Sequence, residues 1–235
     1  MRRIEHIIEP NRVWLVWQPP STVERRLRRI VGEIVRDPSA DTILLNYLNE
    51  SEDFKSASLE GFAGYSAFKI TTAQHTNGVL DAFMRRLPPR NREDFKEYLA
   101  QHRLSDNFDF SDLALLAYTG AKLPGDGFEF CPDLANARPP FEIIFEIAGF
   151  RHQDGARAEE LSIDAKVDFV SEPDNVFDAN AVAVHFNGIR IGYVSRSNTR
   201  AFHEWMRRGY VVQGSIERIN GRPERPLIYL YVSVR

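Results

Sequence analysis

The chain has 235 residues, with 30 lysines and arginines against 33 aspartates and glutamates, 43% hydrophobic residues and a formal charge of −3. This composition is that of a globular protein, and it excludes collagen-like chains, low-complexity chains and highly charged proteins that coat nucleic acid. Cys131 is the single cysteine and no Cys/His pattern accompanies it, so we expect no internal disulfide and no zinc site. No Walker A motif is present, and we expect no other cofactor. The charged start and the lack of a long apolar run predict a cytoplasmic protein.

Turn-forming residues divide the chain into two parts. Proline and glycine cluster between residues 123 and 140, where Leu123-Pro-Gly-Asp-Gly127 and Arg138-Pro-Pro140 interrupt the periodic segments. Each part is long enough to bury its own core. We therefore expect one domain at residues 1–137 and a second at residues 138–235.

The first domain begins with strands. Apolar and aromatic residues at positions 13–17 and 42–48 predict two strands bounded by polar turns. Residues 31–35 are ambiguous, because Ser21 and Glu24 have the spacing of a helix capping box, whereas the stretch itself alternates like a strand.

Helices are expected after these strands. Residues 80–87 predict a helix that ends before two prolines, which cannot continue it. A second helix is expected from a cap at Asn91 to about His102, and a third from a cap at Ser111 to Gly120. Strands followed by helices indicate an α+β fold.

The second domain is rich in short strands. Residues 161–169 alternate between apolar and polar side chains, as in a strand buried on one face. Asn187-Gly188 is the signal of a tight hairpin turn. A single helix is expected at residues 197–208, ended by Gly209, and further strands are expected at residues 181–186, 189–194, 210–219 and 227–234. This arrangement predicts a small β-barrel with one helix.

Charge is distributed unevenly along the second domain. Residues 185–235 hold nine arginines, no lysine and three acidic residues, for a net charge of +6, whereas residues 141–184 hold three basic and ten acidic residues. Guanidinium groups bind phosphate in a bidentate manner and stack on rings. An arginine-rich half is therefore compatible with nucleic-acid binding, and equally with a solvated helix face.

Three short motifs of the second domain resemble the HIRAN domain. They are Gly149-Phe-Arg-His152, expected on the first strand, Glu172-Pro-Asp-Asn-x-Phe-Asp-x-Asn-Ala181 in a loop, and Gly192-Tyr-Val-x-Arg196 before the helix. The resemblance covers residues 141–235. It implies an OB-like barrel that grips the 3′ end of single-stranded DNA.

Carried over to this sequence, the resemblance implies seven DNA-binding residues: Arg151, His152, Asn175, Phe177, Asp178, Tyr193 and Arg196. The two arginines would contact backbone phosphates, and Tyr193 would lie beside the phosphate path. His152 and Phe177 would stack on terminal bases. Asp178 would accept a hydrogen bond from a free 3′ hydroxyl. Core packing and turn formation are the structural alternatives for these residues.

The first domain resembles the N-terminal subdomain of HipA-type toxin kinases over residues 10–130. The motifs that carry this resemblance include Phe83-x-x-x-Leu-Pro-Pro at residues 83–89 and Phe110-Ser-Asp-Leu at residues 110–113. It implies a domain for protein contacts, either dimerisation or docking on a separate HipA-type kinase or another protein partner. The sequence has no Gly-rich phosphate loop or His-Arg-Asp-like catalytic loop, and its length leaves no room for a kinase lobe.

These observations favour a non-catalytic protein that binds single-stranded DNA near 3′ ends and has an N-terminal protein-interaction domain. The first alternative is an antitoxin-like regulatory subunit of a HipA-type kinase. The second is a metal-dependent nuclease, because Asp164-Ala-Lys166 would place a carboxylate and a lysine on one strand face. The same two residues are also ordinary polar positions of an alternating strand.

Overall fold

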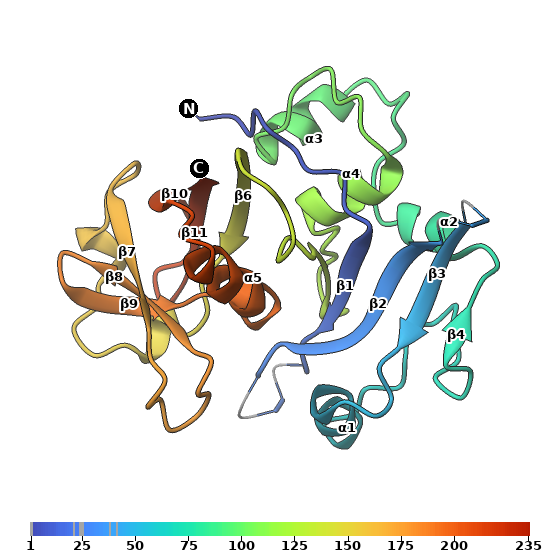
Figure 1. Ribbon diagram of the computed structural model, residues 1–235, viewed down its shortest axis with the longest axis horizontal. Coiled ribbons are helices and arrows are strands. Elements are labelled where there is room, and N and C mark those ends of the chain that lie inside the picture. Colours follow the sequence, from blue (N-terminus) through green and yellow to red (C-terminus); the bar gives the residue numbers. More distant parts are fainter. Residues whose placement is uncertain (1, 21, 24–25, 38, 41) are drawn as a thin grey trace. The chain divides into compact units, whose positions relative to one another are not determined.

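The computed structural model describes residues 2–20, 22–23, 26–37, 39–40 and 42–235 (Figure 1). Its contacts divide the chain into two compact units. The N-terminal unit is Ile8–Asp133, and the C-terminal unit combines Leu134–Arg235 with the short segment Arg2–Ile7. Within the described part of the chain, no helix is both long and apolar enough to cross a membrane.

The N-terminal unit contains a five-stranded antiparallel sheet in the order β4-β3-β2-β1-β5. The ambiguous segment 31–35 lies in the central strand β2, where Val31 and Ile34 are fully buried. The strands predicted at residues 13–17 and 42–48 are confirmed, while the capping box of Ser21 and Glu24 lies outside the described residues. The strands are β1 (Arg12–Trp17), β2 (Arg29–Asp37), β3 (Thr42–Tyr47), β4 (Gln74–His75) and β5 (Phe128–Pro132).

Four helices accompany this sheet: α1 (Glu52–Leu59), α2 (Val79–Met84), α3 (Phe95–Gln101) and α4 (Asp112–Thr119). Both predicted ends of α4 are confirmed, because the Ser111 hydroxyl accepts a hydrogen bond from the Ala114 N–H (3.1 Å) and Gly120 is left-handed (φ 70°). The predicted start of α3 after Asn91 is wrong. The chain after the two prolines first forms turns, with the Arg92 N–H bonded to the Pro89 carbonyl, and the helix begins only at Phe95.

The C-terminal unit contains a six-stranded antiparallel sheet in the order β6-β11-β10-β7-β8-β9, which curls in space (Figure 1). Helix α5 (Arg196–Arg207) packs on it through Phe202 and Trp205, both fully buried; the Trp205 ring lies 5.2 Å from that of Phe141. The strands are β6 (Phe141–Glu146), β7 (Lys166–Ser171), β8 (Val182–Phe186), β9 (Ile189–Tyr193), β10 (Val212–Arg222) and β11 (Arg225–Val234).

In the part of the chain that the structure describes, one pair of backbone hydrogen bonds joins the two edges of this sheet. Ala148, just beyond β6, and Tyr193 at the end of β9 exchange N–H···O bonds of 2.8 and 2.9 Å. A Cβ on Gly192 would lie 2.6 Å from the Ala148 carbonyl oxygen, and φ at Gly192 is +153°, so only glycine fits this crossing. The predicted barrel is thus observed as a curled sheet that one bridge closes.

Two strand predictions in this unit are wrong. Residues 161–169 do not form one strand, because Asp164 is left-handed (φ 65°) and β7 begins only at Lys166. The Asp164 N–H bonds to the Ile216 carbonyl (2.8 Å), and the turn leaves Ile163 53% exposed despite its place in the alternating pattern. Residues 149–152 are not on a strand either. They follow β6 as a 3₁₀ helix, η1 (Phe150–His152), after left-handed Gly149.

The other local predictions in this unit hold. Asn187 and Gly188 both have positive φ (50° and 78°), as a type I′ hairpin between β8 and β9 requires. Helix α5 ends before left-handed Gly209 (φ 73°). A second short 3₁₀ helix, η2 (Ala158–Glu160), lies between η1 and β7.

A buried carboxylate fastens the segment Arg2–Ile7 to the sheet. Glu142 on β6, with a side chain only 1% exposed, accepts hydrogen bonds from the backbone N–H groups of Glu5 (3.0 Å) and His6 (2.8 Å) and from the Arg235 guanidinium (2.6 Å). Burial would raise the pKa of Glu142, but these donors together hold it below its ordinary value. We call this group the Glu142 cluster.

Candidate nucleic-acid interface

Two of the three motif segments of the C-terminal unit, 172–181 and 192–196, meet at one carboxylate. Glu172, just after β7, accepts hydrogen bonds from Arg190 on β9 (Nη1 to Oε1, 3.1 Å) and from Asn175 in the following loop (Nδ2 to Oε2, 2.8 Å). The Tyr193 hydroxyl lies 3.3 Å from the same Oε2 atom and 3.3 Å from Asn175 Nδ2. We call these four residues the Glu172 cluster. It ties the loop after β7 to the strand that leads into α5.

The surroundings of Glu172 favour its charged form. Its partial burial would raise its pKa, but the hydrogen bonds from Asn175 and Arg190, the charge of Arg190 and the Tyr193 hydroxyl lower the pKa below its ordinary value. The Arg190 guanidinium also lies over the Tyr193 ring, 5.2 Å from its centre. The carboxylate therefore orients an arginine and a tyrosine on the same surface.

The loop that Asn175 organises presents two apolar side chains to solvent. The Asn175 side-chain oxygen accepts hydrogen bonds from the N–H groups of Phe177 (3.0 Å) and Asp178 (3.2 Å), which shapes the tip of the loop. Val176 is 88% exposed and Phe177 is 79% exposed. An aromatic ring exposed at a shaped loop tip offers a stacking surface to a planar group. This exposure excludes core packing as the role of Phe177.

Asp178 stabilises the turn between the loop and β8. Its side-chain oxygen accepts a hydrogen bond from the Asn180 N–H (2.9 Å), and its carbonyl accepts one from the Ala181 N–H (2.9 Å). These bonds turn the chain into β8. The side chain is half-buried directly beside the exposed Phe177.

Arg151 and His152 lie on the exposed 3₁₀ helix η1, where Arg151 Nε bonds to His152 Nε2 (3.1 Å). The next residue, Gln153, links this helix to the Glu172 cluster. Its amide nitrogen donates to the Gly149 carbonyl (3.1 Å), and its amide oxygen accepts from Arg190 Nε (2.7 Å). Arg190 thus connects η1 with the motif loop.

Arg196 stands three residues after Tyr193, as the first residue of α5, and its side chain is exposed.

Of the seven residues predicted from the sequence, Asn175 and Tyr193 belong to the Glu172 cluster, and Asn175 positions Phe177 and Asp178. Arg151 and His152 adjoin it through Gln153. Sequence reasoning did not single out Glu172, Gln153 or Arg190 as site residues. Glu172 and Arg190 stood in or near the quoted motifs, but only the fold shows that they bond to each other.

The arrangement required for the nuclease alternative is not present. Asp164 precedes β7 in a left-handed conformation and pairs with Arg2 (3.6 Å), whereas Lys166 is the first residue of the strand, so the two do not share a strand face. Among the residues that the structure describes, no group of three or more histidines, cysteines or acidic residues is placed to hold a metal ion.

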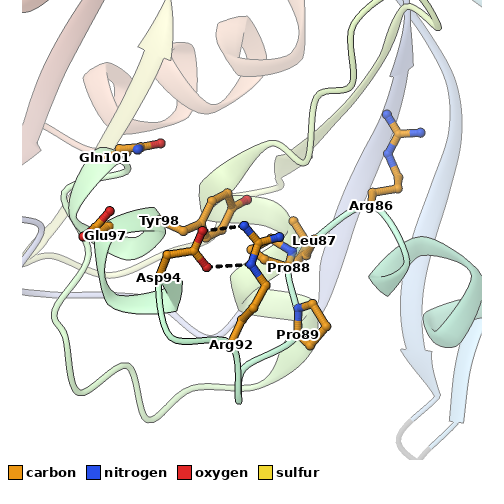
Figure 2. A pocket seen from close by; sticks show the side chains of 9 residues that line it. All are labelled: Arg86, Leu87, Pro88, Pro89, Arg92, Asp94, Glu97, Tyr98 and Gln101. Carbon is orange, nitrogen blue, oxygen red and sulfur yellow. Dashed lines mark hydrogen bonds and ion pairs between the residues drawn. The ribbon is translucent and has the colours of Figure 1, made fainter.

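A shallow groove of about 490 Å³ lies on the N-terminal unit, where the turn after α2 meets α3 (Figure 2). Arg92 and Asp94 form an ion pair across part of it, and Arg86 at its edge is held by Asp126 (2.5 Å). Its lining residues are Arg86, Leu87, Pro88, Pro89, Arg92, Asp94, Glu97, Tyr98 and Gln101. Several of them belong to the proline-containing segment between α2 and α3.

A curled antiparallel sheet with one packed helix and an exposed aromatic loop defines the C-terminal unit as a small barrel-like β domain. Residues 140–234 match the family model of the HIRAN domain, which supports the resemblance seen in its three motifs. The resemblance of the N-terminal region to HipA-type kinases stays a prediction.

Two solved structures are similar to the chain. The crystal structure of the HIRAN domain of human HLTF is 18% identical, with 40% of this chain and 74% of that chain covered and a TM-score of 0.32. The crystal structure of a protein from Lactobacillus plantarum is 19% identical, with 40% and 99% covered and a TM-score of 0.32. No curated protein matches the chain.

Proposed function

We propose that the chain binds single-stranded DNA near a 3′ end through its HIRAN domain. The observation that carries this proposal is the 79% exposed Phe177 ring, presented by a loop that Asn175 and Glu172 organise. Stacking of a base on an aromatic ring contributes about 1–3 kcal/mol and tolerates any sequence. Such a ring, with exposed arginines nearby, suits unpaired bases joined by phosphates.

The arginines supply the electrostatic part of the interaction. Arg151 and Arg196 are exposed on either side of the Glu172 cluster in the chain, and Arg190 is oriented by that cluster. Guanidinium groups bind phosphate oxygens in a bidentate manner. The affinity should therefore fall as the salt concentration rises, because phosphate contacts release counterions.

Asp178 supports a preference for strand ends. Its carboxylate is adjacent to Phe177, and a negative group next to a stacked terminal base disfavours a further phosphate there. A free 3′ hydroxyl, in contrast, can donate a hydrogen bond to it. Placement of the terminal nucleotide on Phe177 would bring its hydroxyl within reach of Asp178.

The test is a fluorescence-polarisation titration with three 5′-labelled strands of one sequence, which carry a 3′ hydroxyl, a 3′ phosphate or a 3′ dideoxy end. The hydroxyl strand should bind about tenfold more tightly than the phosphate strand. Asp178→Asn should remove most of this difference, because the amide keeps the shape but not the charge. Equal affinity for all three ends would contradict end recognition, and no binding of any strand would refute the DNA-binding function itself.

We propose as a second candidate that the N-terminal unit contacts a protein, with a HipA-type kinase as the partner that the resemblance implies. The groove lined by Pro88, Arg92 and Tyr98 supports it, because it is formed by the segment that carries the resemblance. Co-expression with a HipA-type kinase core that lacks its own N-terminal subdomain should yield one complex in size-exclusion chromatography, and Tyr98→Ala should weaken that complex. Separate elution of the two proteins would contradict this candidate.

We propose, finally, that the chain acts by binding and does not itself catalyse a reaction. The lack of a kinase signature in the sequence and the separation of Asp164 from the face of β7 support this view. Incubation of single-stranded DNA with the protein and Mg²⁺ should leave the strand intact. Cleavage that Asp164→Ala abolishes would instead favour the nuclease.

A further inference from the structure

Helix α5 carries a stripe of basic side chains on its outer face. Arg196, Arg200, His203 and Arg207 follow one another at intervals of four, three and four residues, so they lie on one side of an α-helix. The three arginines are exposed and His203 is half-buried. The opposite side of α5 contains the buried residues that pack on the sheet. We call these four residues the α5 stripe.

The α5 stripe retains a positive charge. Glu204 is the single acidic residue of α5, against three arginines in the helix and Arg208 at its end. Arg207 bonds to Glu204 (2.7 Å) and Arg208 lies 3.7 Å from it. By residue count, the helix and Arg208 together hold four arginines against one acidic residue, an excess of positive charge. A surface of this sign favours a polyanion.

The α5 stripe is continuous with the candidate interface. Arg196 begins the helix directly after β9, which carries Tyr193 and Arg190. In the middle of the helix, His203 Nε2 lies 2.8 Å from the carbonyl oxygen of Asn180, at the end of the loop that presents Phe177. Arg200 and Arg207 stand about one helical turn before and after His203. The stripe therefore runs past the base of the loop.

We propose that the α5 stripe binds the phosphates of nucleotides upstream of those held at Phe177, so that a bound strand continues along the helix. The inference rests on the DNA-binding function proposed above and extends it to longer strands. The eleven residue steps from Arg196 to Arg207 span about 16 Å, at about 1.5 Å per residue, which is long enough to meet two or more phosphates of one strand. The arginine forks suit such phosphates.

The test compares unlabelled oligothymidylates of four and twelve nucleotides as competitors for a 5′-labelled twelve-nucleotide strand, all with free 3′ hydroxyls. The variant is Arg200→Gln/Arg207→Gln in the full chain, since glutamine is a good helix former. The matched control, Arg222→Gln/Arg225→Gln, removes the same charge from two exposed arginines at the turn between β10 and β11.

The α5 variant should bind the twelve-nucleotide strand about tenfold more weakly at low salt. Its salt slope should fall by about 1.4, at about 0.7 for each lost phosphate contact on a single strand. Its affinity for the tetranucleotide should change less than twofold, and the control variant should behave like the wild type for both strands.

Three outcomes would overturn the inference. Retention of twelve-nucleotide affinity and salt slope by the α5 variant would show that the stripe is not used. An equal loss of affinity for both strand lengths would mean that the stripe contacts the terminal nucleotides held at Phe177, or that the substitutions damage the fold. An equal loss in the control variant would reduce the effect to net charge. If the wild type binds neither strand, the proposed function fails as well, and this result is distinct from the other three.

Discussion

Two carboxylates of the C-terminal unit have similar partners but opposite surroundings. Glu142 and Glu172 each accept a hydrogen bond from an arginine, and each has a pKa below its ordinary value. The Glu142 side chain is 1% exposed, whereas that of Glu172 is 24% exposed. One lies within the packed structure and the other at its surface.

The groups that these carboxylates join explain the difference. The Glu142 cluster connects the two ends of the chain, since it binds the backbone of Glu5 and His6 and the side chain of Arg235. The Glu172 cluster connects one loop with one strand. A buried acceptor with several donors contributes to global stability, because its loss leaves those donors unpaired. A half-exposed acceptor can be replaced by water, and its main effect is on local geometry.

The largest expected effect on stability is at Glu142. Glu142→Ala should lower the free energy of unfolding of the C-terminal unit by about 3 kcal/mol, because Arg235 and two backbone N–H groups lose their acceptor. Urea titration followed by tryptophan fluorescence and circular dichroism measures this change. Glu159→Ala, at an exposed acid of the same unit, is the matched control and should alter stability by less than about 0.5 kcal/mol. If Glu142→Ala lowers the free energy of unfolding by less than about 1 kcal/mol, the proposed contribution of Glu142 to global stability is wrong.

The next effect is on binding alone, at the surface that the Glu172 cluster supports. Phe177→Ala should weaken single-stranded DNA binding by about 1–3 kcal/mol, the contribution of one base–aromatic stack, without measurable change in the unfolding transition, since the ring is 79% exposed. Val176→Ala, at a neighbour that is equally exposed but lacks a ring, is the control and should bind nearly as the wild type does. Destabilisation by Phe177→Ala would mean that the ring belongs to the core.

Acid sensitivity should depend on Glu142 more than on Glu172. Because the pKa of Glu142 in the folded protein is below its ordinary value of 4.5, its contribution to stability is present above that pH and is lost as the pH falls through the lower, folded pKa. Glu142→Gln cannot titrate, so its free energy of unfolding should vary less between about pH 5 and pH 3 than that of the wild type. Glu172→Gln should reduce that slope less than Glu142→Gln does, because the Glu172 side chain is more exposed and water can replace its partners. An identical slope in the Glu142 variant and the wild type would contradict the assignment.

The smallest expected effect on DNA binding is at Asn175. Asn175→Ala removes the acceptor for the Phe177 and Asp178 N–H groups, and we expect a stability loss below about 1 kcal/mol because the loop is at the surface. DNA binding should weaken several-fold, since the loop must then be ordered on binding. Asn180→Ala on the same loop is the control. Asn180 bonds to Asp178 and His203 through its backbone N–H and carbonyl groups, which the substitution keeps. Equal DNA affinity of the two variants would contradict a positioning role for Asn175.

Sequence reasoning succeeded where a few neighbouring residues control the backbone. The cap of α4 at Ser111, its end at Gly120 and the hairpin at Asn187-Gly188 are each determined by hydrogen bonds or φ angles within about four residues. It failed at residues 161–169, where alternation suggested one strand. There the bond from Asp164 to Ile216, a residue more than fifty positions away, turns the chain before β7 begins.

The amino-acid sequence by itself determined the motif segments that resemble the HIRAN domain, the arginine-rich half that contains α5, and the residues proposed to contact DNA. Only the tertiary structure decided that Glu172 joins Arg190 and Tyr193, that Gln153 brings η1 to the same surface, and that Arg2–Ile7 fasten to β6 through Glu142. Capping, turns and periodicity act over a few residues and can be read locally. The bonding of groups that stand about 20 to 140 positions apart depends on how the whole sheet curls and excludes water, which no short segment encodes.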